Sequence, residues 1–328
     1  MPRSGKRLAG ALMSEPIPVT VIAGALGSGK TTLVNHVLRE SVGRRIAVLV
    51  NDFGELDIDA AVIESANAAT ISLRNGCICC SLGGGMTEGL AALRTLGSRP
   101  DQILVEASGV SLPRGLLGAV GGPGLRLDGI LVVVDAVDIT LRARDHYVGD
   151  TVREQIASAD LLVLNKVDEA TTTELDAART LLATEAADVP VLETAYGAAP
   201  LPVLLGPLDP QRHTALPHSI DYRHTELDTA SFQSDNPIDA EVFGHWLAHL
   251  PRGVLRAKGL VRLAGDSSSA RLVQVVGTRR RLTRVDPSVA IPGARLVVIG
   301  APGSFTDELF LPLATSRPQD TQSGQGSP

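Results

Sequence analysis

Several features that define other protein classes are missing from this chain of 328 residues. It contains no run of about 18 apolar residues, the length that spans a bilayer, so no membrane partner is expected. It has no excess of basic residues either: its formal net charge is −6, whereas proteins that bind the backbone of nucleic acids usually carry a basic domain or stripe. Aromatic residues make up only 3%, which favours an aliphatic α/β core. Nucleic acid is therefore not an expected partner.

The N-terminal stretch MPRSGKRLAGALMSEP is basic, but its apolar patch, LAGALM, is too short for a secretory signal. We therefore expect residues 1–17 to be a flexible tail and the protein to be cytoplasmic. The length of the chain is typical of two domains.

Cysteine is absent except in one loop. Cys77, Cys79 and Cys80 stand together in the stretch NGCICCSLGG. In a reducing compartment, clustered cysteines are more often metal ligands or redox groups than structural disulfides. Three thiolates can converge on one Zn²⁺ or another soft ion and leave one tetrahedral position open. The Cys77-x-x-Cys80 spacing also fits thiol–disulfide chemistry, and plain burial is a third interpretation.

A histidine-rich stretch is missing as well, because the seven histidines are scattered along the chain. This distribution argues against bulk storage of metal. His245 and His249 are four residues apart in EVFGHWLAH, a spacing that can bind a metal on a helix. The apolar residues around them favour an ordinary surface or partly buried position.

The clearest motif lies in IPVTVIAGALGSGKTTLVNHVL. A β-branched run over residues 19–23 predicts a strand, and the apolar spacing over residues 32–38 predicts a helix. The pattern Gly-x-x-x-x-Gly-Lys-Thr between them is a phosphate-binding loop, in which backbone N–H groups, a lysine and a Mg²⁺-binding hydroxyl meet the phosphates. We expect a nucleotide and Mg²⁺ to bind at Gly24, Gly27, Ser28, Gly29, Lys30, Thr31 and Thr32.

Four further apolar runs end in polar residues: RIAVLVND, QILVEASG, GILVVVDA and DLLVLNKVD. Such runs are typical of buried parallel strands whose carboxyl ends meet at one edge. The last run ends in Asn165-Lys166-Val167-Asp168. The Asp168 carboxylate can accept from the two donors on the guanine edge, which adenine does not offer. Asn165 and Lys166 are expected beside the base, so the sequence predicts a guanine nucleotide.

The run ending in Glu106-Ala-Ser-Gly109 predicts the γ-phosphate side of the site. Glu106 is expected near Mg²⁺ and the N–H group of Gly109 near the γ-phosphate. Lys30, Thr31, Glu106 and Gly109 are therefore the candidate catalytic residues. Val110 follows where small GTPases place a glutamine that orients water, so we expect slow hydrolysis without a metal or a partner.

Taken in order, the segments GALGSGKTTLVNHVL, VLVNDFGELDID, RNGCICCSL, ILVEASGV, ILVVVDA, QIASADLLVLNKVD and VLRAKGLVRL resemble the CobW-type metallochaperone GTPases. The resemblance runs from about residue 18 to residue 313. It implies a P-loop G-domain with a mostly parallel wound sheet, followed by a smaller α+β domain. It also implies GTP hydrolysis coupled to loading of a metal onto a client protein, with Zn²⁺ or Co²⁺ held by Cys77, Cys79 and Cys80.

Two alternatives from other classes remain. A P-loop small-molecule kinase would need an acceptor pocket and no guanine motif. A redox module would work without nucleotide. Oligomeric state, client and pathway are not readable from the residues.

The segment NDFGELDID matches a family stretch near the nucleotide, according to the resemblance. Asp52, Glu55, Asp57 and Asp59 are acidic candidates for coupling Mg²⁺ or the transferred metal to the nucleotide. Each of them also fits an ordinary solvated loop.

Prolines recur and periodicity fades in ETAYGAAPLPVLLGPLDPQRH, which predicts a domain boundary near residue 212. We expect a GTPase domain over 18–212, a linker over 213–224, an α+β domain over 225–314 and a disordered tail over 315–328. The basic stretch GTRRRLTR reads as a hairpin, either a solvated tip or a contact for an acidic partner.

Overall fold

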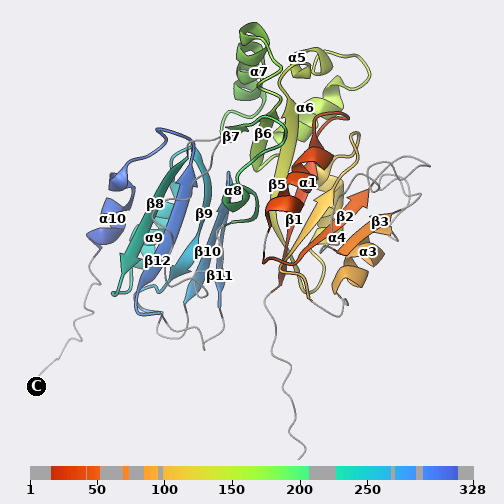
Figure 1. The fold of residues 1–328 in the computed structure, drawn as a ribbon. Coiled ribbons are helices and arrows are strands. Elements are labelled where there is room, and N and C mark those ends of the chain that lie inside the picture. The colour runs from red at the N-terminus through yellow and green to blue at the C-terminus, as the bar shows by residue number, and fades with distance from the viewer. Residues whose placement is uncertain are drawn as a thin grey trace, which may run out of the picture.

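The computed structural model describes residues 16–41, 43–51, 69–73, 85–94, 99–206, 227–266, 270–285 and 291–316. These residues form two sheets that lie side by side (Figure 1). The first sheet belongs to the N-terminal part and the second to the C-terminal part. No helix among the described residues is long and apolar enough to cross a membrane.

The first sheet has seven strands in the order β3-β2-β4-β1-β5-β6-β7, and every neighbouring pair is parallel. Strands β4 and β6 are buried on both faces, as their continuous apolar runs predict. Their bounds are β1 Ile17–Ala23, β2 Ile46–Asn51, β3 Ala69–Leu73, β4 Gln102–Glu106, β5 Leu125–Asp135, β6 Leu161–Asn165 and β7 Val191–Glu193.

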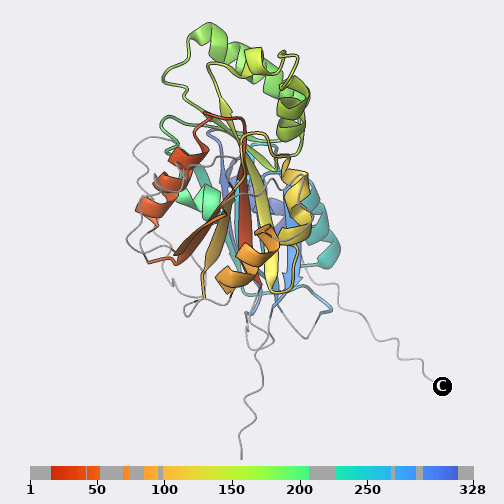
Figure 2. The same ribbon diagram turned by 90° about the vertical axis from the view of Figure 1, so that its right-hand side faces the viewer.

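Helices cover both faces of this sheet (Figure 2). Helices α1 (Lys30–Glu40) and α8 (Leu201–Leu205) pack on one face. The opposite face is covered by α3 (Gly85–Arg94), η1 (Pro113–Leu116), α4 (Leu117–Val120), α5 (Ile139–Arg142), α6 (Gly149–Ala157) and α7 (Thr172–Glu185). Such alternation of strands and helices gives the wound α/β fold that the sequence predicts, and this prediction is confirmed.

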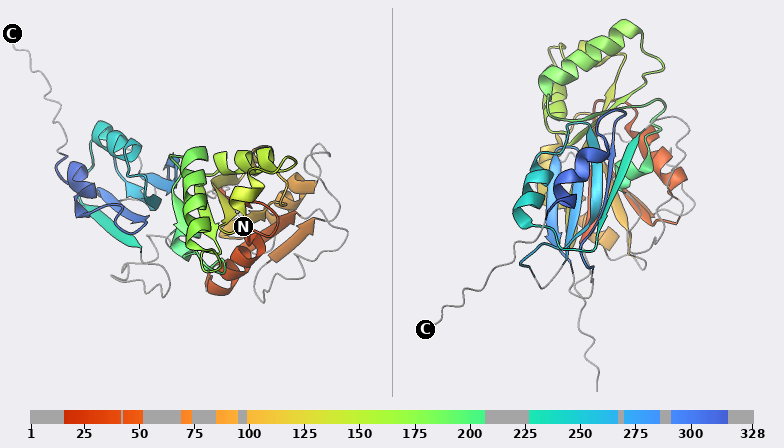
Figure 3. Two further views of the ribbon diagram at one scale, coloured as in Figure 1. Left: turned by 90° about the horizontal axis from the view of Figure 1, so that it is seen from above. Right: turned by 90° about the vertical axis from the view of Figure 1, so that its left-hand side faces the viewer.

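The second sheet is antiparallel, with five strands in the order β11-β10-β9-β12-β8. Its elements are β8 Asp228–Ser234, α9 Ala240–Ala248, β9 Val254–Val261, β10 Arg271–Val276, β11 Arg279–Arg284, β12 Ala294–Gly300, η2 Asp307–Phe310 and α10 Leu311–Ala314. Helices α9 and α10 pack on its outer face (Figure 3). Trp246 of α9 and Leu313 of α10 join the core there, as does Phe310 of η2.

The inner face of the second sheet packs on the same side of the first sheet as α1 and α8. Alternating residues of β12 show this division, since Leu296 and Val298 join the core under α9 while Val297 and Ile299 join the core around α1. A buried ion pair also joins the two halves: Arg256 Nη2 of β9 lies 2.6 Å from Asp128 Oδ2 of β5.

The structure adds detail to two sequence interpretations. Helix α8 lies in the proline-rich stretch after residue 193, within the expected GTPase domain, and its Val203 and Leu204 are fully buried in the core. With only five residues, this helix is too short to show periodicity in the sequence. The basic stretch Arg279–Arg284 is the outermost strand β11, and its first arginine pairs with Asp160 at 2.7 Å, so it is not simply a solvated tip.

Candidate functional site

The phosphate-binding loop connects β1 to α1 through glycines with left-handed backbone. Gly29, with φ 100°, begins α1, and a Cβ there would lie 2.2 Å from the Asn165 amide nitrogen. Gly27, with φ 79°, has no atom within 4 Å of a Cβ position, so the loop is open on that side. No side chain caps α1. The uncapped N–H groups of the first helical turn therefore fit a phosphate group.

The lysine and hydroxyls of the loop lie at the start of α1. Lys30 is buried, and its Nζ donates to the Ala25 carbonyl at 3.0 Å. The Thr31 hydroxyl donates to Glu106 Oε1 at 2.6 Å. The buried Ser28 hydroxyl has no hydrogen-bond partner within the described part of the chain. An orphaned buried hydroxyl and a hydroxyl–carboxylate pair are groups that a phosphate and a hard cation such as Mg²⁺ would satisfy.

Asn165 holds the loop to the next strand. Its Nδ2 donates to the Ser28 carbonyl at 3.0 Å, and its Oδ1 accepts from the Gly197 backbone N–H at 3.0 Å. The side chain is buried, with both polar ends engaged by backbone groups. Contact of Asn165 with guanine stays a prediction. In the structure, the Asn165 side chain links the phosphate loop to the turn after β7.

Lys166 and Asp168 follow at the same edge. Lys166 Nζ pairs with the Asp135 carboxylate at 2.5 Å, and this hydrogen bond raises the pKa of Lys166. Asp168 is exposed. Its carboxylate interacts with the hydroxyl of Tyr196, which raises the pKa of the phenol. The residues predicted for guanine therefore lie together, and Tyr196 lies with them.

The turn that follows β4 is the segment predicted to face the γ-phosphate. A Cβ on Gly109 would lie 2.6 Å from the backbone nitrogen of Leu26, so this turn touches the phosphate loop. Val110 is 56% exposed and carries no group that could orient water. Gln155 of α6 donates to the carbonyls of Gly109 and Ser111 at 3.2 Å and 3.0 Å.

Sequence reasoning missed three participants: Gln155, Tyr196 and Gly197. Gln155 carried a signal, because it stands three residues after Val152 and beside Ile156, on the apolar side of the helical spacing in TVREQIASA. Tyr196 and Gly197 lie in the proline-rich stretch, where the sequence shows no periodicity. Their place became evident only from the β7 turn that brings them to the guanine motif.

The predicted metal ligands Cys77, Cys79 and Cys80 lie outside the described residues, as do the acidic candidates Asp52, Glu55, Asp57 and Asp59. Within the described ranges, no group of three or more His, Cys, Asp or Glu residues could hold a metal ion. His245 and His249 are exposed and stacked, with ring centroids 4.0 Å apart. His249 Nδ1 also lies 2.8 Å from the His245 carbonyl oxygen, so this pair is explained by helix-end contacts.

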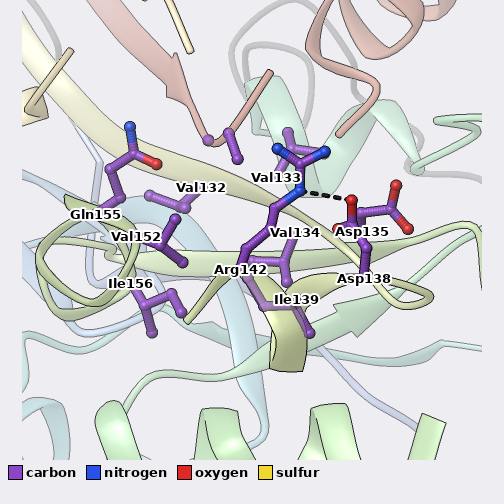
Figure 4. A pocket seen from close by; sticks show the side chains of 12 residues that line it. Val132, Val133, Val134, Asp135, Asp138, Ile139, Arg142, Val152, Gln155 and Ile156 are labelled. Atoms are coloured by element: carbon purple, nitrogen blue, oxygen red, sulfur yellow. Dashed lines mark hydrogen bonds and ion pairs between the residues drawn. The ribbon is translucent and has the colours of Figure 1, made fainter. Parts of the chain in front are cut away.

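A small pocket lies behind the phosphate loop (Figure 4). Side chains from the end of β5, from α5 and from α6 surround it, among them Val133, Asp138 and Gln155. Arg142 and Asp138 form an ion pair at 2.5 Å on one side of it. The pocket is apolar over most of its wall. Gln155 is the polar lining residue that contacts the turn after β4.

Comparison with known proteins gives a consistent result. The family model of the CobW/HypB/UreG nucleotide-binding domain matches residues 18–193, and that of the cobalamin synthesis protein cobW C-terminal domain matches residues 227–309. The zinc chaperone CobW of Pseudomonas aeruginosa is 35% identical, over 87% of this chain and 87% of that protein. A zinc chaperone CobW of a Sinorhizobium species is 30% identical, over 87% of this chain and 92% of that protein.

Among solved structures, the Zn(II)-bound YjiA GTPase from Escherichia coli matches with 23% identity and a TM-score of 0.46, over 92% of this chain and 99% of that one. The two family models, in the order found here, and the identity to two curated relatives over most of the chain establish the relationship that the motifs predicted. The chain therefore belongs to the CobW family of P-loop GTPases.

Proposed function

We propose that this chain hydrolyses GTP to GDP and phosphate and uses that reaction to control the binding of a transition metal, Zn²⁺ above all, at Cys77, Cys79 and Cys80. The observation that carries the proposal is that β4, β1, β5 and β6 bring the phosphate loop, the Thr31–Glu106 pair and the guanine motif to one edge of the sheet. The relatives named zinc chaperones support zinc as the metal. Co²⁺ remains the second candidate, because thiolate sites select metals partly by availability.

The phosphates would lie over Gly24–Thr32, with the charge of Lys30 between the β- and γ-phosphates. A phosphate oxygen is a stronger acceptor for the Lys30 ammonium than the neutral Ala25 carbonyl, to which Nζ donates in this structure. The Thr31 hydroxyl and the Glu106 carboxylate would hold Mg²⁺, directly or through water. Bound Mg²⁺ neutralises the charge that develops on the transferred phosphoryl group.

Guanine would be selected by Asp168, whose carboxylate accepts from N1–H and the 2-amino group. Adenine presents no such pair of donors, so it would leave a carboxylate without partners. Gly109 would donate its N–H group to the γ-phosphate. Val110 cannot orient the attacking water, and we therefore expect slow turnover until a metal or a client protein is bound.

The metal loop follows β3 in sequence. Leu73 at the end of β3 pairs with Asn51 at the end of β2, so the chain enters the cysteine segment from the nucleotide edge of the sheet. We propose that GTP orders residues 51–80 against the γ-phosphate and draws the three thiolates together, and that hydrolysis releases the metal to a client metalloprotein. Thiols persist in the reduced, metal-binding form in a reducing compartment, so we propose that the protein acts in the cytoplasm.

The test is an anaerobic competition titration of Zn²⁺ against a chromophoric chelator. The protein is loaded with Mg²⁺ and either GDP or a non-hydrolysable GTP analogue. We expect tighter zinc binding with the analogue, lost in Cys79→Ser. Reciprocity then requires zinc to tighten analogue binding by the same factor.

The matched control is His245→Ala, which removes the exposed histidine pair of α9 and should leave zinc affinity unchanged. Equal zinc affinity in both nucleotide states would overturn the coupling. It would leave a GTPase with a structural or redox-active thiol loop.

A further inference from the structure

Gln155 is a buried polar side chain that makes all of its observed hydrogen bonds to one turn. It projects from α6 and is 1% exposed (Figure 4). Its Nε2 donates to the Gly109 carbonyl at 3.2 Å and to the Ser111 carbonyl at 3.0 Å. Both protons of the amide are therefore used on the turn that follows β4.

This turn is closed within itself. The Ser111 backbone N–H donates to the Ser108 carbonyl at 3.0 Å, and the two serine hydroxyls are 2.7 Å apart. The turn therefore behaves as one unit. The position of the turn relative to the phosphate loop therefore depends on its contacts with other elements. Gln155 supplies two of these contacts, the hydrogen bonds to the carbonyls of Gly109 and Ser111.

These hydrogen bonds hold the turn at a place where a small displacement of Gly109 would change its distance to the phosphate loop. Gly109 approaches Leu26 of the phosphate loop so closely that a Cβ would lie 2.6 Å from the Leu26 nitrogen. A hydrogen bond to a γ-phosphate depends strongly on distance and angle. Because Gln155 holds the turn at two carbonyls, the Gly109 N–H group stays at a fixed distance from the phosphate loop.

Packing alone does not explain a glutamine here. Its helix neighbours Val152 and Ile156 belong to the apolar core, and an apolar side chain of the same volume would fill the position. Burying an amide is unfavourable unless its hydrogen bonds are made, and this amide makes them only to the Gly109 turn among the residues described.

We propose that Gln155 is a positioning residue for the γ-phosphate: it holds the turn of residues 108–111 where the Gly109 N–H group meets the terminal phosphate of a nucleoside triphosphate. This inference rests on the proposed GTPase function and adds a residue to it. Gln155 does not touch the nucleotide itself. It acts through Gly109, so its loss affects triphosphate recognition and turnover and spares diphosphate binding.

The experiment compares Gln155→Met with Gln102→Met in the full-length protein. Gln102 is also a buried glutamine, 4% exposed, and its Nε2 donates to the Thr20 hydroxyl at 2.7 Å. It stands at the start of β4, at the edge of the sheet opposite to the nucleotide. Each variant loses one buried amide donor, so a general effect of that loss on stability should appear in both.

We measure the affinities for GDP and for a non-hydrolysable GTP analogue, and kcat for GTP. In Gln155→Met the ratio of analogue affinity to GDP affinity should fall about tenfold, with kcat falling alongside and GDP affinity unchanged, as expected when hydrogen bonds that place a donor are lost. Gln102→Met should keep the wild-type ratio. Gln155→Glu, which keeps the shape but replaces both N–H donors with an acceptor carboxylate facing two carbonyl oxygens, should lower the ratio at least as far as Gln155→Met.

A wild-type ratio in both Gln155 variants, or the same decrease in Gln102→Met, would overturn the inference while leaving the GTPase function intact. The opposite failure is separate: a wild-type protein that neither binds nor hydrolyses GTP would overturn the proposed function. Equal losses of GDP and analogue affinity would show that Gln155 supports the fold of the whole site and has no specific role at the γ-phosphate.

Discussion

Lys166 and Tyr196 are the two residues other than glycine, within the described part of the chain, whose backbone is left-handed, with φ of 62° and 53°. Such a conformation is unfavourable for a large side chain and tends to persist where function requires it. Both residues lie beside Asp168, in the part of the site predicted to bind guanine. Neither conformation is readable from sequence, because it is imposed by contacts with distant strands such as that of Gly197 with Asn165.

Tyr196→Phe removes only the hydroxyl that meets Asp168. We expect GDP affinity to fall severalfold, about the effect of one hydrogen bond that orients a carboxylate, because Asp168 loses the partner that fixes it. The side chain is 72% exposed, so the melting temperature should not change. Isothermal titration with GDP measures the change. Tyr147→Phe, at an exposed tyrosine before α6, is the control, and an equal affinity in both variants would contradict the role of the hydroxyl.

At the scale of elements, α1 is the part that joins the site to its surroundings. It begins at the phosphate loop, and its residue His36 reaches the carbonyl of Ala199, just before α8, at 3.0 Å. Burial lowers the pKa of His36 below its ordinary value, and it outweighs the Ala199 carbonyl and Glu40, which raise the pKa. The folded protein therefore favours the neutral imidazole.

The sign of the pH effect follows from this lowered pKa. Because the pKa of His36 is lower in the folded protein, the unfolded state takes up a proton on this histidine at a higher pH than the folded state does. The stabilising contribution of the neutral imidazole is therefore complete above about pH 7 and is lost as pH falls through the folded pKa. We expect the melting temperature to decrease as pH falls below about 7, and to decrease less in His36→Gln. His146→Gln, at an exposed histidine, should follow the wild type. An identical acid shift in all three proteins would exclude His36 as a cause.

The elements that the sequence predicted well are those with a strong local pattern. The strands ending at Glu106, Asp135 and Asn165 are continuous apolar runs, and the glycines and Lys30 of the phosphate loop have a fixed spacing. Short elements such as β7 and α8 have no room for periodicity. The partnership of Gln155 with Gly109 joins positions 46 residues apart, which no local pattern reports.

At the scale of the whole molecule, one buried ion pair links the two sheets. The side chains of Asp128 and Arg256 are 1% and 2% exposed. Burial by itself raises the pKa of Asp128, but the positive charges of Arg256 and Arg126 lower it by a larger amount. The net pKa is therefore below its ordinary value, and the carboxylate is ionised. A buried pair of this kind is weak evidence of stability by itself, yet breaking it leaves a charge without compensation.

Arg256→Met should therefore destabilise the protein by about 3–5 kcal/mol, since Asp128 remains buried without its main partner. Adding Asp128→Asn should restore much of the loss. Urea denaturation gives the midpoints of all variants. The matched control is Arg252→Met, whose ion pair with Asp188 is 75% and 76% exposed and should be worth less than about 1 kcal/mol. A shift no larger than that of the control would show that the interface does not depend on this pair.

The outermost strand of the second sheet, β11, has one further consequence. An outermost strand leaves a row of backbone N–H and C=O groups without a neighbour, and a strand of another chain can pair with that row. Arg280, Arg281 and Arg284 are exposed along β11, and a second copy would bring the same charges against them. Self-association by pairing of β11 with β11 of a second copy is therefore opposed by like-charge repulsion. A strand that pairs at this edge of the sheet has to carry neutral or acidic side chains opposite these arginines.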